Sequence, residues 1–135
     1  MSISFDEYYV KFESFTERHY IKSFSKKYKS SWVETESSIV SFLSRIDTVL
    51  GNTTRAEIVH AKGCKKIIKL DFKIAGSNES AKTSGNRAVV FVDDNQKECR
   101  VLLVYSKNDI SSPNETQKWQ AIIKENYSDI WSIFS

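Results

Sequence analysis

The sequence has few residues that commonly bind metals and no long apolar run. Its 135 residues include two cysteines and two histidines, and Cys64 and Cys99 lack the paired Cys-x-x-Cys spacing of zinc sites. Two reduced thiols are the simpler interpretation. No apolar run approaches the ~20 residues that a membrane-spanning helix needs, and the N-terminus lacks a basic region followed by a long apolar one. We therefore expect a soluble, cytoplasmic protein with no metal and no membrane partner.

Motifs for common enzyme chemistry are also missing. The chain has no phosphate-binding glycine loop, no Ser-His-Asp pattern and no dinucleotide fingerprint, so we expect no cofactor. Hydrophobic residues make up 40% of the sequence and 17 residues are aromatic. That is enough for one well-buried core, whereas 135 residues are too few for two ordinary domains. We predict a single domain over residues 1–135.

Positive charge is concentrated in the middle of the chain. Residues 1–59 carry 8 bases and 8 acids, residues 60–107 carry 10 and 5, and residues 108–135 carry 2 and 4. Within the middle part, seven bases fall inside 26 residues. A concentrated basic region on a protein whose net charge is +3 indicates a polyanionic partner.

The first half of the chain predicts a strand and two helices. Residues 8–15 alternate loosely and are interpreted as a strand, although their aromatics could also open a helix. Residues 20–28 have one apolar face and a lysine-rich opposite face. Residues 31–50 form the clearest helix, with Ser31 and Glu34 as a capping box. A short turn between the two helices predicts an antiparallel hairpin.

The second half predicts a sheet and a final helix. Residues 51–64 have no sustained period and are interpreted as a connection, and strands follow near 65–75, 87–93 and 99–106. Asn114 and Gln117 can cap the last helix. We predict an α+β fold in which the hairpin packs on a small, mostly antiparallel curved sheet. The expected core joins strand residues Ile68, Leu70, Phe72, Val90, Leu102 and Val104 to helix residues Ile39, Leu43 and Ile46.

A polar and basic segment enters the middle strand. It reads Lys82-Thr-Ser-Gly-Asn-Arg87 and is followed by the apolar run 88–92, while the next strand closes with Tyr105-Ser-Lys107-Asn-Asp109. The two segments resemble those of RelE/HigB-like toxins of type II toxin–antitoxin systems, within the RelE/ParE superfamily. In that family a K-S-G-G-x-R segment precedes one strand and an I/V-Y-x-K-N segment closes the next.

The resemblance implies a toxin-type endoribonuclease that cleaves mRNA on the ribosome and inhibits translation. By this resemblance Arg87 stabilises the phosphoryl charge, Lys73 and Lys82 hold the RNA backbone, and Tyr105 or Lys107 lies near the leaving group. An arginine fork suits such a role. From position alone, however, Arg87 also fits a solvated strand end, and Tyr105 an ordinary core aromatic.

Four lysines, including Lys73, lie in the predicted strand before this segment. Lys65, Lys66, Lys69 and Lys73 are candidate contacts for RNA phosphates, or else they line a water-facing side of the sheet and limit aggregation. His60 is interpreted as a histidine of the connecting loop without a chemical role.

Two other functions fit the sequence. One is a ParE-like, non-catalytic toxin that binds a protein target such as gyrase, and the other is a nucleic-acid-binding module. As a toxin the protein would have a cognate antitoxin as partner, with an acidic or amphipathic segment that covers the basic face.

Overall fold

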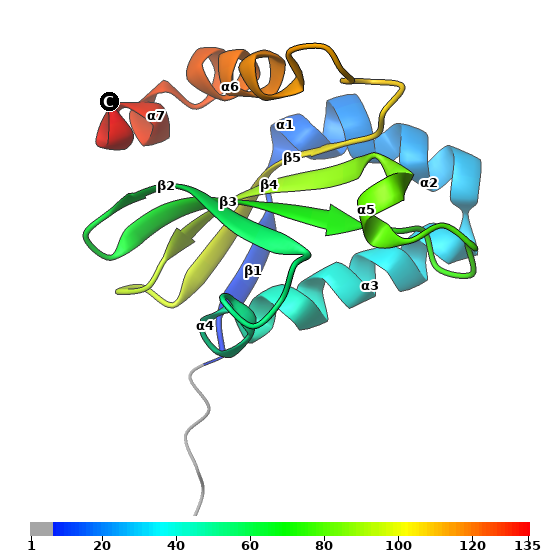
Figure 1. Cartoon of the computed structure of the whole chain (residues 1–135), viewed down its shortest axis with the longest axis horizontal. Coiled ribbons are helices and arrows are strands. Elements are labelled where there is room, and N and C mark those ends of the chain that lie inside the picture. The colour runs from blue at the N-terminus through cyan, green and yellow to red at the C-terminus, as the bar shows by residue number, and fades with distance from the viewer. Residues whose placement is uncertain (1–6) are drawn as a thin grey trace, which may run out of the picture.

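The computed structural model describes residues 7–135 and contains a five-stranded sheet with helices on both of its sides (Figure 1). The strand order is β1-β5-β4-β3-β2, with β1 parallel to β5 and every other pair antiparallel. The expected mixed α+β fold is confirmed. The strands are β1 (Tyr9–Phe12), β2 (Ala56–Lys62), β3 (Lys65–Phe72), β4 (Asn86–Asp93) and β5 (Glu98–Tyr105).

Helices precede, interrupt and follow the antiparallel strands. They are α1 (Ser14–Thr16), the π-helical turn η1 (Glu17–Ile21), α2 (Lys22–Tyr28), α3 (Ser30–Ser44), α4 (Ile46–Val49), α5 (Ala81–Ser84), α6 (Glu115–Asn126) and α7 (Ser128–Phe134). None of those between residues 7 and 135 is long and apolar enough to cross a membrane.

Helices α2, α3 and α4 cover the first face of the sheet. Their buried side chains Phe24, Ile39 and Leu43 belong to one cluster with Phe72 and Val90 of the strands. The ring of Phe24 stacks on Trp32 with centroids 4.9 Å apart, which ties α2 to α3. The expected contact between the apolar stripe of residues 31–50 and the sheet is confirmed.

Leu102 is the one strand residue whose predicted place in this cluster is wrong. It is fully buried, but it belongs to the cluster on the second face. The pairing of β4 with β5 shifts at this point, because Val89 opposes Leu103 while Val90 opposes Val101. Leu102 is therefore the extra residue of a bulge, which breaks the alternation on which the prediction depended.

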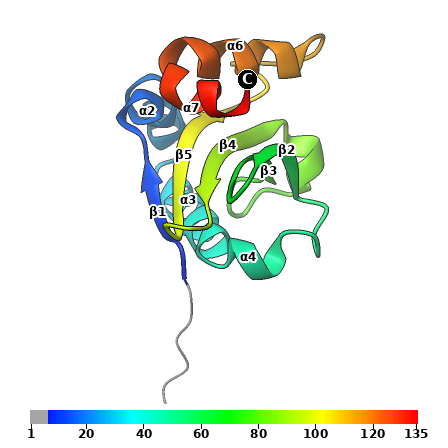
Figure 2. The same ribbon diagram turned by 90° about the vertical axis from the view of Figure 1, so that its left-hand side faces the viewer.

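The C-terminal helices α6 and α7 cover the second face. Figure 2 shows them on the opposite side of the sheet from α3 and α4. Trp119, Ile123 and Ile130 are buried against Ile67 and Phe91 of the strands. The C-terminal segment is therefore part of the core, and it occupies much of the face that the sequence assigned to RNA.

Several predicted boundaries are wrong. Helix α3 begins at Ser30 and has no side-chain cap, so Ser31 lies inside the helix and forms no capping box with Glu34. Asn114 likewise precedes α6 without a side-chain capping bond. The first helical segment starts at Ser14, close behind a strand that ends at Phe12.

Residues 56–62 form the edge strand β2 instead of a connection. A register shift between Ile58 and His60 interrupts the alternation and hides the strand from pattern analysis. His60 consequently lies on β2, where its ring contacts Trp131 of α7 edge-on with centroids 5.4 Å apart. The expectation of a loop histidine is corrected.

We predict that Trp119→Ala lowers the free energy of unfolding by about 3–5 kcal/mol, because a fully buried indole leaves a large cavity. Val33→Ala is the control, since Val33 is 65% exposed and its truncation should cost less than about 0.5 kcal/mol. Urea unfolding of both variants measures the difference. Equal, small effects would contradict the placement of α6 in the core.

Candidate functional site

One row of residues crosses the polar end of the sheet. Arg87 on β4 lies opposite Asp71 on β3 and opposite Tyr105 on β5. All three side chains belong to the second face, because they share the alternation of the buried Val89 and Ile67. We call Asp71, Arg87 and Tyr105 the cross-strand row. It joins both segments on which the family resemblance rests.

Arg87 has partners for most of its donors. Its Nε lies 3.0 Å from Asp71 Oδ1. Its Nη1 donates to the carbonyls of Ala81 and Asn86, and its Nη2 donates to the carbonyl of Lys82 at 2.9 Å. Four of its five N–H donors are therefore engaged. Arg87 holds the α5 turn in place and keeps one donor for a further acceptor.

Tyr105 is fully buried, and its hydroxyl donates to Glu115 Oε2 at 2.6 Å. Glu115 is the first residue of α6, so this bond fastens the C-terminal helix to the row. Burial, together with Glu115, raises the pKa of Tyr105 far above its ordinary value. The phenol stays protonated at physiological pH, and a substrate can reach it only if α6 moves aside.

The cluster of charges around the row is partly desolvated. Burial raises the pKa of Asp71, and the nearby charges of Arg87 and Lys69 offset only part of that increase. Lys69 lies beside this carboxylate and also pairs with Glu57, with 3.4 Å between Nζ and Oε1. Among residues 7–135, no three His, Cys, Asp or Glu side chains form a group that could hold a metal ion.

Lys73 and Lys82 are exposed bases that lie close to the row along the chain, the first just after Asp71 and the second shortly before Arg87. Lys82 lies in α5 directly before the segment that leads into β4, and none of residues 7–135 forms an ion pair with it. Lys73 follows β3 and its Nζ donates to the Ser77 carbonyl at 3.2 Å. Both can meet a polyanion without losing a salt bridge.

Lys65 and Lys66 lie at the other end of β3. An eight-residue strand spans roughly 26 Å, so they cannot share one short binding site with Lys73. Lys66 moreover points to the first face, where it pairs with Asp94, which also accepts from Tyr8. The structure thus divides the lysines that the sequence grouped on one RNA-binding face.

Gly85 packs against Lys107. Its φ is 78°, and a Cβ added there would lie 2.6 Å from Lys107 Cβ. The turn before β4 and the turn after β5 can touch only because position 85 has no side chain. This contact, with the opposed pair Arg87 and Tyr105, brings the two sequence segments into one place.

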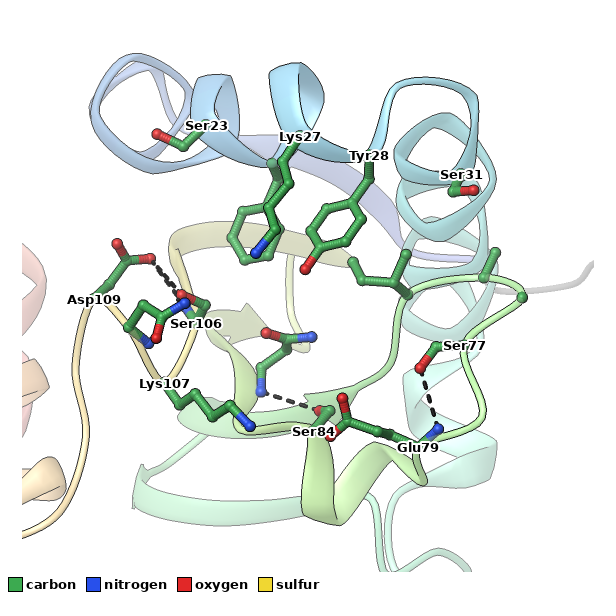
Figure 3. Close-up of a pocket in the computed structure, with 16 residues that line it drawn as sticks. Ser23, Lys27, Tyr28, Ser31, Ser77, Glu79, Ser84, Ser106, Lys107 and Asp109 are labelled. Carbon is green, nitrogen blue, oxygen red and sulfur yellow. Dashed lines mark hydrogen bonds between the residues drawn. The ribbon is translucent and has the colours of Figure 1, made fainter.

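A cavity of about 570 Å³ opens beside this contact on the first face. We call it the helix–loop pocket, because α2 forms one wall and the loop of residues 74–79 another. Figure 3 shows Lys27 and Tyr28 pointing into it from the helix, with Lys107 and Glu79 on the opposite side.

The pocket is not predicted by the sequence. Asn86, which belongs to the polar segment before β4 and has no predicted role, lines it. The available signal was alternation, because Asn86 is in phase with the inward residues Ala88 and Val90, and a polar residue at an inward strand position invites a search for its partner.

Comparisons with known proteins give one structural likeness. No family model and no curated protein matches the chain. A solved structure described as an archaeal RelE–RelB complex from Pyrococcus horikoshii OT3 superposes with a TM-score of 0.49 and 12% sequence identity, over 75% of this chain and 96% of that one. A likeness at this level carries neither activity nor partner over to the present chain.

We predict that Gly85→Ala destabilises the protein more than Gly76→Ala. Both glycines have a similar positive φ, 78° and 83°, but nothing lies within 4 Å of a Cβ at position 76. Both variants carry the strain of a left-handed residue, about 1–2 kcal/mol, while Gly85→Ala adds a clash with Lys107 that costs about another 1–3 kcal/mol. Thermal unfolding measures both, and equal shifts would argue against the contact.

We predict that the stabilising effect of Asp94 depends on pH. Burial acts to raise the pKa of Asp94, but hydrogen bonds from Lys66 and Tyr8 outweigh it and lower the pKa. Its contribution is therefore present above the unfolded pKa of about 3.9 and is lost as pH falls through the lower folded-state pKa. Asp94→Asn should cost about 1 kcal/mol at pH 7, because its 35% exposed side chain is screened.

The measurement for Asp94 is urea unfolding of wild type and variant at neutral pH and near pH 2. The two should differ most at neutral pH, and the difference should shrink as the pH is lowered below the ordinary pKa of an aspartate. A difference that persists undiminished in acid would show that the carboxylate charge is not its source.

Proposed function

We propose that this chain is a toxin-type endoribonuclease of the RelE/HigB class, which cleaves mRNA on the ribosome and so inhibits translation. Residues 1–135 act as one domain in the cytoplasm, with α2 and α3 as the helical hairpin that backs the sheet. A cognate antitoxin is the natural partner, because such an activity must be restrained in its own cell.

The meeting of the two motif segments carries this proposal. Lys82–Arg87 and Tyr105–Asp109 are distant in sequence, yet Arg87 opposes Tyr105 and Gly85 contacts Lys107. Residues that a family pattern groups for one activity should lie together in space, and these do. The exposed ammonium groups of Lys82 and Lys107 at this place suit a phosphate backbone.

The proposed reaction is an internal transesterification of RNA. The ribose 2′-oxygen bonds to the adjacent phosphorus, the bond from phosphorus to the 5′-oxygen breaks, and the proton lost by the 2′-hydroxyl is balanced by one gained at the 5′-oxygen. Positioning and charge stabilisation supply most of the rate enhancement in such a site. Lys82 and Lys107 bind the flanking phosphates, and Arg87 offers its remaining donor to the scissile phosphoryl group.

Tyr105 takes a positioning role in this proposal. Its hydroxyl bonds Glu115, and its raised pKa makes it a poor general base. It lies opposite Arg87 and keeps α6 at the edge of the site. In this proposal Lys69 adds positive charge beside Asp71, although its ammonium also pairs with Glu57, and Lys65 contacts a longer RNA beyond the cleavage site. Lys66 points to the other face and pairs with Asp94, so it takes no part in the cleavage site.

The second candidate function is a non-catalytic, ParE-like toxin that binds a protein target. The engaged donors of Arg87 and the burial of Tyr105 favour it, because they leave few groups free for acid–base chemistry. A nucleic-acid-binding module without cleavage fits the same observations. The exposed lysines around residue 82, which form no salt bridge within residues 7–135, favour RNA over a protein as the partner.

We predict that Lys82→Ala reduces mRNA cleavage by translating ribosomes about 10- to 100-fold, since it removes an exposed phosphate-binding charge without touching the core. Lys124→Ala on α6 removes the same charge from an exposed position away from the site and should leave cleavage unchanged. Arg87→Lys tests whether the planar guanidinium group is needed, because lysine keeps a positive charge near Asp71 but cannot reproduce the bonds to the α5 carbonyls.

Cleavage by each variant is compared with wild type only where thermal unfolding shows that the variant is folded. Wild-type cleavage by a folded Lys82→Ala variant would contradict the site assignment. Growth arrest by the wild type without cleavage of any RNA would replace the ribonuclease proposal with the protein-target function.

We also predict that RNA binding weakens steeply with salt, because each lysine that neutralises a phosphate releases a counterion. Titration of a short RNA at several salt concentrations should give a logarithmic slope of about −0.7 per phosphate contact, so three contacts give about −2. Lys82→Ala should reduce the slope by about one contact. Affinity that stays level with salt would speak for the protein-target function.

A further inference from the structure

The helix–loop pocket lies across the sheet from the cross-strand row. Asn86 lines the pocket and Arg87 belongs to the row, and as neighbours on one strand they point to opposite faces. The pocket volume of about 570 Å³ is within the range of small-molecule sites, roughly 300–1,000 Å³. Of the residues that line this cavity, the proposed cleavage reaction uses only Lys107.

The side chain of Asn86 offers a ligand hydrogen bonds from the wall of the pocket. Asn86 is 8% exposed. Its backbone N–H donates to Ser84 Oγ and its carbonyl accepts from Arg87, but its side-chain amide has no hydrogen-bond partner among residues 7–135. The polar atoms of this amide are not among the buried side-chain atoms of residues 7–135 that lack a partner, so they face the pocket opening and are open to solvent. A ligand that enters the pocket can replace that water with one donor and one acceptor.

Two lysines reach the pocket without a carboxylate partner. Lys27 comes from α2 and Lys107 from the turn after β5 (Figure 3). Within residues 7–135 neither forms a salt bridge, although Lys27 Nζ lies 5.2 Å from the ring centre of Tyr28. Of the two carboxylates nearby, that of Asp109 already accepts bonds from Ser106. The pocket can therefore hold an anionic group between two ammonium ions.

The remaining walls suit a planar ring and a sugar. Tyr28 is partly exposed and points into the cavity, so its ring can stack on a base. Glu79 also reaches the cavity, and a carboxylate at such a place commonly bonds ribose hydroxyls. The amide of Asn86 offers one donor face and one acceptor, the pattern that pairs with the N6 and N7 edge of adenine.

We infer that the helix–loop pocket binds a single nucleotide, with Asn86 on the base edge, Tyr28 on its ring, Glu79 on the ribose and the two lysines on the phosphate. Adenine is the preferred base. The nucleotide is either a free mononucleotide or one residue of an RNA strand that also crosses the row, and the second case rests on the proposed function.

Calorimetric titration of the full chain tests this inference. The probes are AMP, CMP, adenosine, inorganic phosphate and a short adenine-containing RNA with 2′-O-methyl riboses, which cannot be cleaved by its own 2′-oxygen. We expect saturable binding of AMP that is tighter than that of CMP, adenosine or phosphate. Tighter binding of the RNA than of AMP identifies the strand as the source, and weaker binding identifies the free nucleotide.

The variants locate the site. Asn86→Ala should weaken AMP binding about tenfold and remove the preference over CMP, because it deletes a bidentate base contact. Lys27→Gln, at an exposed helical position, should weaken AMP binding severalfold while leaving adenosine binding unchanged. Lys124→Gln is the matched control and should change neither. Lys27→Gln also keeps the test decisive if Asn86→Ala fails to fold.

Three results would overturn the inference: no saturable binding of AMP or RNA to wild type, equal binding of phosphate and AMP, or AMP binding that Lys27→Gln and a folded Asn86→Ala leave intact. The outcome is separable from the proposed function. RNA cleavage without nucleotide binding in the pocket would remove this inference alone, and nucleotide binding without cleavage would remove the ribonuclease alone.

Discussion

Strands β4 and β5 are buried on both faces, and this burial determines where the helices pack. Residues 88–92 of β4 are apolar and buried without a break, so each face of this strand needs its own cover. Helices α3 and α4 supply one cover and α6 and α7 the other. What stays accessible is the end of the sheet where β4 begins with polar residues, and both candidate sites lie there.

The sequence predicted those features that depend on neighbouring residues of one segment. The alternation of β3 identified its two faces, and the apolar stripe of residues 31–50 identified the helix that covers one of them. The polar segment before β4 and the tyrosine that ends β5 were singled out from residue type and order. The ladder register then placed Arg87 directly opposite Tyr105.

Long-range packing decided what the sequence could not predict. The stripe of the C-terminal helix was visible, but nothing local told which face it would cover. The sequence predicts that Arg87 faces a phosphate or solvent, whereas most of its donors bond other groups of the protein. Two of its acceptors are backbone carbonyls of α5, and such acceptors cannot be recognised from a sequence. A bulge moved Leu102 to the other face, and the pocket around Asn86 needed segments far apart in the chain.

In the proposed function, RNA binds this protein at the polar end of the sheet. Chemical-shift mapping of isotope-labelled protein with a short RNA carrying 2′-O-methyl riboses tests it most directly. Perturbed backbone amides should concentrate in residues 82–87 and 106–109, with little change at Lys65 and Lys66. Perturbations centred on the opposite end of β3, with residues 82–87 unaffected, would contradict it.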